Sequence, residues 1–426
     1  MRLKGGLLAA LTVLAALAQD PRKVLTLADA QTIALRNYPA LASATLNAQA
    51  AGEQVRQAKS SLLPTLSGNF TNVGAEQDTS IAAGNITTSS LSSRAGAGGI
   101  AVSQLITDFG RTNKLIESTS LRAQAQQQRV ALSRAQVLLN VTQAYFRTQR
   151  ARSVLEVARA TVATRRIVLR QVSALAESSL KSTLDVSFAE VNLSDAELSL
   201  LRAENQANGA QAELSAAMGS PTAEAFELTE EPLPAPLGDV QAAIQDALKQ
   251  RPDLASLALN KDSATRFAEA EKRLWMPSIS FLGAAGAIPF RESKLQGTYG
   301  AAGVNVNIPV FNGHLFSARR GEAEFRAEAA GKDVQELSLQ ITRDVKLAWL
   351  EADTASHRMD LAARLLAQAG KSLRLAQSRY DLGLSSIVEF TTAQLNKTSA
   401  EMEQARAKYD YQIAVAALGY QTGALK

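Results

Sequence analysis

Residues 137–169 read VLLNVTQAYFRTQRARSVLEVARATVATRRIVL, and residues 341–373 read ITRDVKLAWLEADTASHRMDLAARLLAQAGKSL. In the first stretch, positions taken in alternating steps of four and three hold mostly apolar or small residues, as in a heptad seam. They are Val137, Val141, Ala144, Thr148, Ala151, Leu155, Ala158, Val162, Arg165 and Leu169. No glycine or proline occurs between residues 111 and 208. This pattern predicts very long, closely packed helices.

The seam returns 204 residues later, and there every position is apolar. The positions are Ile341, Val345, Ala348, Ala352, Ala355, Met359, Ala362, Leu366, Ala369 and Leu373. Pro39 and Pro64 return as Pro252 and Pro277, 213 residues on, so a length change of about nine residues lies between these landmarks. Such a region is expected to be exposed. The chain is therefore predicted to be a tandem duplication.

The duplication predicts a first copy at residues 19–231 and a second at 239–426. A proline-rich, stiff linker at 232–238 joins them.

The amino-terminal residues have the pattern of a secretory signal peptide, predicted at residues 1–18. Arg2 and Lys4 precede an apolar run from Leu7 to Leu17, and a small-x-small site ends at Ala18. The run is too short to span a membrane, and no later segment reaches 18 uninterrupted apolar residues. The alternative is a buried terminal helix.

Between the helical regions of each copy the apolar period changes from about 3.5 to 2, which indicates strands. The pattern predicts one β-hairpin at about 65–107 and another at about 278–310, with polar connections at 76–93 and near 290–298. Strands of about ten residues cross a bilayer when tilted. Two soluble hairpins on a helical rod are the alternative. Four strands cannot close a barrel in lipid, so at least two chains must contribute, and three chains would give twelve strands.

Composition excludes several classes of function. The formal charge of +5 is small for 426 residues, and no basic patch points to a nucleic-acid partner. Cysteine is absent, and His314 and His357 stand 43 residues apart, so no metal site is expected. No nucleotide fingerprint or nucleophile motif occurs. The sequence therefore predicts neither an enzyme nor a cofactor.

Taken together, these features resemble the TolC-like outer-membrane efflux protein family, the outer membrane factors of tripartite export systems. The most specific local pattern is YDLGLSSIVE at residues 380–389, with its first-copy counterpart SSLKSTLD at 178–185. The resemblance implies a mostly α fold with membrane β-hairpins: a homotrimer whose helices form an α-barrel tunnel and whose strands share a twelve-stranded β-barrel. It implies a Gram-negative-type outer membrane with its lipid, and a tunnel extending into the periplasm. The implied partners are a periplasmic adaptor and an inner-membrane RND, ABC or MFS pump, for drug efflux or type I secretion.

The resemblance also implies functional positions at the helix-to-helix turns. The implied periplasmic gate is Asp185, Tyr380 and Glu389. The implied adaptor-docking tip is Gly383, Leu384, Ser385, Ser179 and Leu180. Three positions depart from the family pattern: Ser385 replaces an arginine of the gate, Thr392 replaces an acid, and Ser179 replaces a glycine.

A purely structural interpretation of the acids is also open. Ser182-x-x-Asp185 and Ser386-x-x-Glu389 both have the spacing of capping boxes that open the return helices. Two other classes of protein compete with the export duct. A periplasmic adaptor would carry one helical hairpin within β-rich domains, and a structural coiled coil would not need four period-2 segments.

Overall fold

The computed structural model describes residues 24–74, 79–83, 86–90, 94–221, 226–290 and 296–425, so the predicted signal peptide lies outside the described residues. The helices are α1 (Leu27–Asn37), α2 (Pro39–Ser60), α3 (Arg111–Glu177), α4 (Thr183–Ala217), α5 (Val240–Gln250), α6 (Pro252–Lys272), α7 (Leu315–Asp381) and α8 (Ile387–Gln421), with a 3₁₀ turn at Arg273–Trp275. The strands are β1 (Val24–Leu25), β2 (Thr65–Gly74), β3 (Thr79–Ala83), β4 (Ile86–Ser90), β5 (Arg94–Thr107), β6 (Glu227–Leu228), β7 (Ser278–Phe290) and β8 (Thr298–Asn307).

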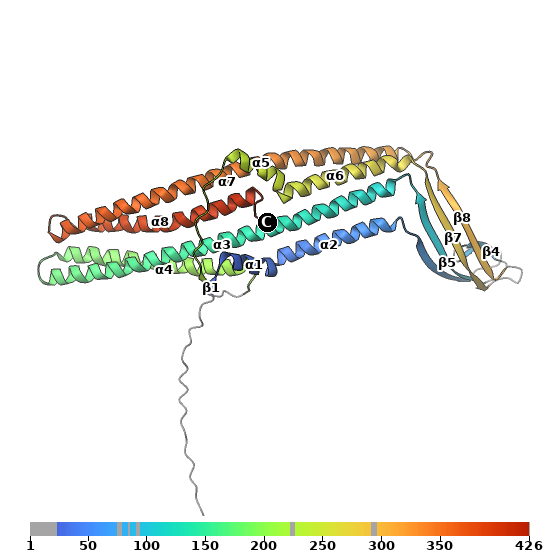
Figure 1. The fold of residues 1–426 in the computed structure, drawn as a ribbon. Coiled ribbons are helices and arrows are strands. Elements are labelled where there is room, and N and C mark those ends of the chain that lie inside the picture. The colour runs from blue at the N-terminus through green and yellow to red at the C-terminus, as the bar shows by residue number, and fades with distance from the viewer. Residues whose placement is uncertain are drawn as a thin grey trace, which may run out of the picture. The chain divides into compact units, whose positions relative to one another are not determined.

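One series of elements occurs twice in the same order (Figure 1). Two helices, two long strands, a long helix and a return helix follow one another in each copy. The long helices α3 and α7 both have 67 residues, which corresponds to about 100 Å of helical rise. The return helices α4 and α8 both have 35 residues. The predicted class of tandem-duplicated long helices with antiparallel strands is therefore confirmed.

The chain folds into two compact units, and each unit draws on both copies. Unit 1 comprises residues 1–37, 141–234 and 362–409, and unit 2 comprises 38–140, 235–361 and 410–426. Side-chain packing in each unit thus joins segments that are about 200 residues apart in sequence. The boundaries at 231 and 239 remain a prediction about the repeats.

The long strands form one antiparallel sheet in unit 2, in the order β2-β5-β7-β8. The two hairpins have the same register. Thr65 lies opposite Ser103 in the first, and the positions 213 and 204 residues on, Ser278 and Asn307, lie opposite each other in the second. The sheet leaves β2 and β8 as edge strands without a partner among the described strands.

The connection between β2 and β5 differs from the prediction. Residues 76–93 were expected to be an irregular polar link, yet β3 and β4 within it pair as a short antiparallel hairpin. Alternating Ser and Thr are good strand formers, but the segment lacks the apolar face by which period-2 strands are identified.

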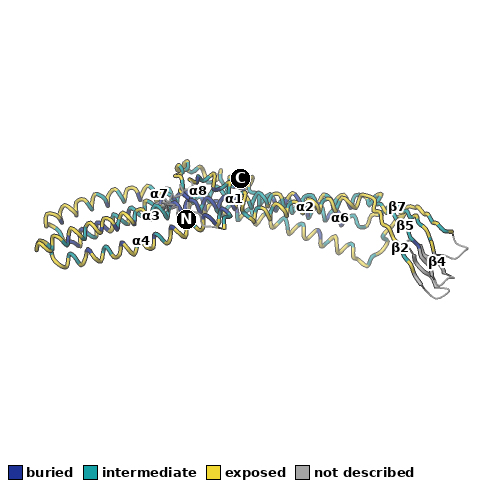
Figure 2. The backbone as a smooth tube through the Cα atoms, turned by 90° about the horizontal axis from the view of Figure 1, so that it is seen from below, coloured by how far each residue is buried: buried dark blue, intermediate teal, exposed yellow. Residues whose placement is uncertain are grey.

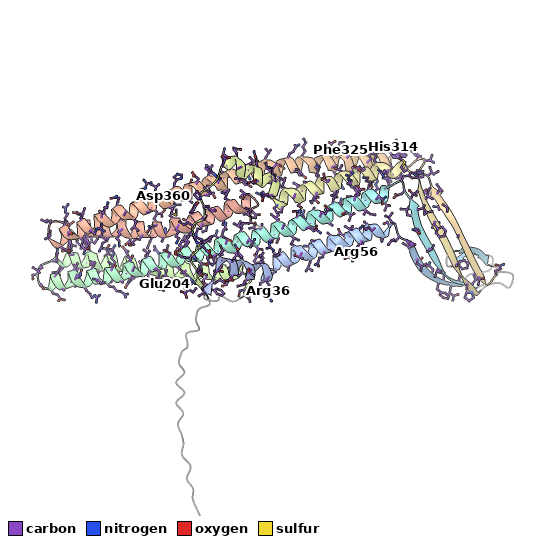
Figure 3. The ribbon with its side chains drawn as sticks, viewed as in Figure 1. Arg36, Arg56, Glu204, His314, Phe325 and Asp360 are labelled. Atoms are coloured by element: carbon purple, nitrogen blue, oxygen red, sulfur yellow. The ribbon has the colours of Figure 1, made fainter. Side chains whose placement is uncertain are left out.

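The turns into α3 and α7 each contain two successive residues in the left-handed region. These are Phe109 and Gly110 in the first copy, and Gly313 and His314 in the second (Figure 3). Asp108 caps α3, because its Oδ2 accepts the Thr112 amide hydrogen at 2.8 Å. A glycine occupies a different half of the turn in each copy, so both turns keep one residue for which this conformation is unstrained.

The predicted seams are buried where they meet other helices. In unit 1, Val154, Leu155 and Ala158 of α3 pack against Ala203 and Ala207 of α4. These small residues let the two helix backbones approach closely. Figure 2 shows the most deeply buried backbone around α1, whereas α4 is largely exposed along its length.

In unit 2, the second seam packs on α5. Ile341 and Val345 of α7 are fully buried against Ile244 and Ala247. Over the described ranges, no helix combines the length and the apolar character needed to cross a membrane.

A buried carboxylate ties three helices of unit 2 together. The Glu271 side chain, at the end of α6, is 1% exposed. Its Oε2 lies 2.7 Å from Arg319 Nε of α7, and its Oε1 lies 3.4 Å from Arg111 Nη2 of α3. Both arginines are partly exposed, so the acid is the member of the cluster that cannot regain water if a partner is lost.

This asymmetry predicts an order of stabilities. Replacing both Arg111 and Arg319 by Met leaves the Glu271 carboxylate buried and unpaired, and should cost roughly 3–5 kcal/mol. Glu271→Met removes the buried charge itself and should cost clearly less. Urea denaturation followed by tryptophan fluorescence measures this, since Trp275 and Trp349 both lie in unit 2. A larger loss in Glu271→Met than in the double variant would contradict the assignment.

Candidate functional site at the helix tips

The candidate site comprises the two turns that reverse the chain in unit 1, from α3 to α4 and from α7 to α8 (Figure 1). The turns occupy residues 178–182 and 382–386. Every predicted gate and docking residue lies in one of these turns or in the adjoining helical turn.

Both turns close their helices with the same Schellman motif. In the first copy the Ser179 amide donates to the Ala176 carbonyl at 2.9 Å, and the Leu180 amide donates to Leu175 at 2.8 Å. In the second copy the Gly383 and Leu384 amides make the equivalent bonds, at 3.1 and 2.7 Å. The motif requires a left-handed residue, which is Ser179 at φ 58° and Gly383 at φ 71°. The serine that departs from the family pattern thus keeps the turn geometry.

These motifs project two leucines into solvent. Leu180 is 71% exposed and Leu384 is 66% exposed. Ser385, beside Leu384, has a buried Oγ without a hydrogen-bond partner among the described residues. Paired exposed leucines at equivalent positions are a feature of contact surfaces for a partner.

The return helices begin differently in the two copies. At α4, Ser182 Oγ accepts the Leu184 amide hydrogen at 3.1 Å, and Asp185 Oδ2 accepts the Ser182 amide hydrogen at 3.2 Å. The predicted capping box is therefore complete at α4. At α8 the Glu389 amide donates to Ser386 Oγ at 3.4 Å, but the Glu389 carboxylate is turned to another partner. The prediction of a second complete box is wrong in that half.

The partner is Arg379, in the last turn of α7. Its Nε lies 3.6 Å from Glu389 Oε1, and both side chains are about half exposed. Arg379 therefore supplies an arginine to the acid although Ser385 occupies the family position. Sequence reasoning missed this pair because the ten-residue separation crosses a turn, where no helical spacing applies.

Tyr380 is buried at the base of the second turn. Its ring stacks on Phe390 with centroids 5.3 Å apart, and the Lys181 ammonium of the other turn lies 3.7 Å above it. Lys181 Nζ also donates to the Tyr380 carbonyl at 3.3 Å. These contacts join the two turns of unit 1.

Burial, and then the charges of Asp185 and Asp381, raises the pKa of Tyr380 to about 12. The phenol therefore stays neutral at physiological pH. Its hydroxyl is buried without a hydrogen-bond partner among the described residues. The structure thus brings Asp185 within electrostatic reach of Tyr380, whereas Glu389 is paired with Arg379.

The two histidines lie apart from this site. His314 is in the turn into α7, and His357 Nδ1 lies 2.9 Å from the Asp353 carbonyl oxygen. In the described part of the chain, no group of three or more histidine or acidic side chains is placed to hold a metal ion.

A duplicated subunit of long helices with an open antiparallel sheet defines the class of helical outer-membrane channel proteins, and three comparisons with known proteins agree. The family model "Outer membrane efflux protein" matches residues 32–220 and 243–424. Among curated proteins, outer membrane protein TolC of Vibrio cholerae is 23% identical over 411 residues, which cover 94% of this chain and 91% of that protein.

Solved structures share the fold. A membrane protein from Pseudomonas aeruginosa superposes with a TM-score of 0.81 at 22% identity, covering 93% of each chain. The outer membrane protein VceC from Vibrio cholerae gives a TM-score of 0.81 at 17% identity, covering 93% of this chain and 96% of that one.

The chain belongs to the outer membrane efflux protein family, and its place is the outer membrane of Gram-negative bacteria. This family consists of channels rather than enzymes. Neither a periplasmic adaptor nor a structural coiled coil accounts for a family match in both copies.

Proposed function

We propose that the protein is the passive outer-membrane duct of a tripartite efflux or type I secretion system, assembled as a homotrimer. The observation that carries this proposal is the open four-stranded sheet of unit 2. Its two edge strands, β2 and β8, offer backbone donors and acceptors that have no partner among the described strands.

Lipid does not tolerate such edges, because an unpaired amide or carbonyl in hydrocarbon costs several kcal/mol. Side chains on both edges suit lipid, since Leu66 and Phe70 of β2 and Val304 and Val306 of β8 are exposed and apolar. Successive strands alternate in direction, so β8 of one copy can pair antiparallel with β2 of the next. Three copies then close a twelve-stranded barrel.

The duplication also predicts the register of this joint. Within the chain, Ala101 of β5 lies opposite Ala284 of β7, where the first copy meets the second. If β8 meets the next β2 in the same way, the offsets of 204 and 213 carry this pair to Asn305 and Thr71. These two residues should face each other across the boundary between protomers.

A disulfide tests the joint directly, because the protein has no cysteine of its own. Thr71→Cys with Asn305→Cys should link protomers into covalent trimers under mild oxidation, since directly opposed residues have Cα atoms about 4.5–5.5 Å apart. Non-reducing gel electrophoresis of outer membranes measures the products.

Thr71→Cys with Ala301→Cys is the matched control. It keeps the same strands and faces but shifts one cysteine by four residues, or about 13 Å. It should remain monomeric on the gel. Equal cross-linking of both pairs, or none in either, would contradict the proposed assembly.

At the helix tips, the proposed adaptor-docking surface is Gly383, Leu384, Ser385, Ser179 and Leu180. Its support is the repetition of the same turn with an exposed leucine in both copies. An adaptor that meets three protomers would encounter six such turns of closely similar backbone. The energy for export would come from an inner-membrane pump of the RND, ABC or MFS class.

The proposed gate is formed by Asp185, Tyr380 and Glu389, with Arg379 added by the structure. In a trimer, three Glu389 carboxylates would surround one axis, and Arg379 beside each acid would offset part of its charge. The balance between these two residues should then set the preference of the pore for cations.

The two members of the pair should act in opposite directions. Glu389→Gln removes the acid, and should reduce cation preference and block by trivalent cations. Arg379→Gln leaves the acid uncompensated, and should increase both. Single-channel currents in planar bilayers, with the blocker added to each side in turn, measure the effect. Changes of the same sign in both variants would remove Glu389 from the gate and leave it a helix-capping residue.

A further inference from the structure

Arg165 is the one charged residue on the first heptad seam, and Ala369 occupies the equivalent position of the second. The Arg165 side chain lies within the packing of unit 1, where the residue is only 6% exposed. Charged side chains are seldom buried this far without a partner of opposite charge. The seam position alone therefore does not account for an arginine here.

No carboxylate in the described part of the chain pairs with Arg165. The neighbouring cations are already satisfied: Arg166 lies 2.8 Å from Glu197, and Lys397 lies 2.8 Å from Glu401. Arg165 Nη1 is buried without an acceptor. Burial lowers the pKa of Arg165, and no acid opposes that effect.

The guanidinium lines a pocket of about 90 Å³ between α3 and α8. Gln394 of α8 lines the same pocket, is also 6% exposed, and has a buried Oε1 that no donor reaches. Thr161, Thr164 and Leu373 complete the nearest wall. The pocket thus holds one unmet donor with a positive charge, Arg165, and one unmet acceptor, Gln394.

We propose that this pocket binds a small oxyanion that carries one negative charge and at least one hydroxyl, of the class of dihydrogen phosphate. An anionic oxygen would accept from Arg165 Nη1, and the hydroxyl would donate to Gln394 Oε1. Because Glu401 neutralises Lys397, a single negative charge balances the site. Water could satisfy both hydrogen bonds, but it would leave the buried charge uncompensated.

The bound anion acts as a brace between the two copies. Arg165 belongs to α3 of the first copy, and Gln394 belongs to α8 of the second. At the second-copy position, Ala369 offers no group to bind an anion, so the site occurs once in each chain.

Equilibrium dialysis of the detergent-solubilised full-length protein against radiolabelled inorganic phosphate tests this site. At about pH 6, where the singly charged form is abundant, one phosphate should bind per chain. Sulfate, which carries no hydroxyl at that pH, should compete poorly. Arg165→Met should weaken phosphate binding by about tenfold or more, as loss of a charged hydrogen bond does.

Arg166→Met is the matched control, since the adjacent arginine is exposed and paired with Glu197. It should leave phosphate binding unchanged. Gln394→Leu keeps the arginine, and should abolish the preference for phosphate over sulfate, a readout that altered helix packing alone would not produce. Absence of phosphate binding by the unmodified protein, or equal binding in Arg165→Met, would overturn the proposal.

Discussion

Backbone hydrogen bonding at the two edges of the β2-β5-β7-β8 sheet is the constraint on which the rest of the assembly depends. A membrane interior supplies no water to unpaired amides and carbonyls, so a chain that contributes four strands cannot be a complete outer-membrane protein. The chain answers with repetition at two levels. The hairpins share one register because they derive from one duplicated unit, and the same joint can be used again between protomers.

The duplication also explains how the two compact units are built. Each unit takes segments from both copies, so helices of the first pack on helices of the second. The equal lengths of α3 and α7, and of α4 and α8, let these partners stay in register. Small seam residues such as Ala158 and Ala203 keep the packing close, and the buried Glu271 fixes α3, α6 and α7 to one another.

Sequence periodicity predicted the long helices, the duplication and the four long strands, because each depends on a regular spacing of apolar residues. It missed β3 and β4, whose Ser- and Thr-rich strands bury no apolar face. At the candidate site it located both turns and the capping box at Asp185, since those depend on neighbours in sequence. It missed the Arg379–Glu389 pair and the isolation of Arg165, because partners across a turn or between helices are set by tertiary packing.

The central claim is that the channel exists only as an assembly of three chains that share one sheet. Native mass spectrometry of the protein extracted from outer membranes in mild detergent tests this most directly. The account predicts a single species with three times the mass of the mature chain, and no stable folded monomer. A monomer in the same membranes that keeps the four-stranded sheet with both edges unpaired would contradict it.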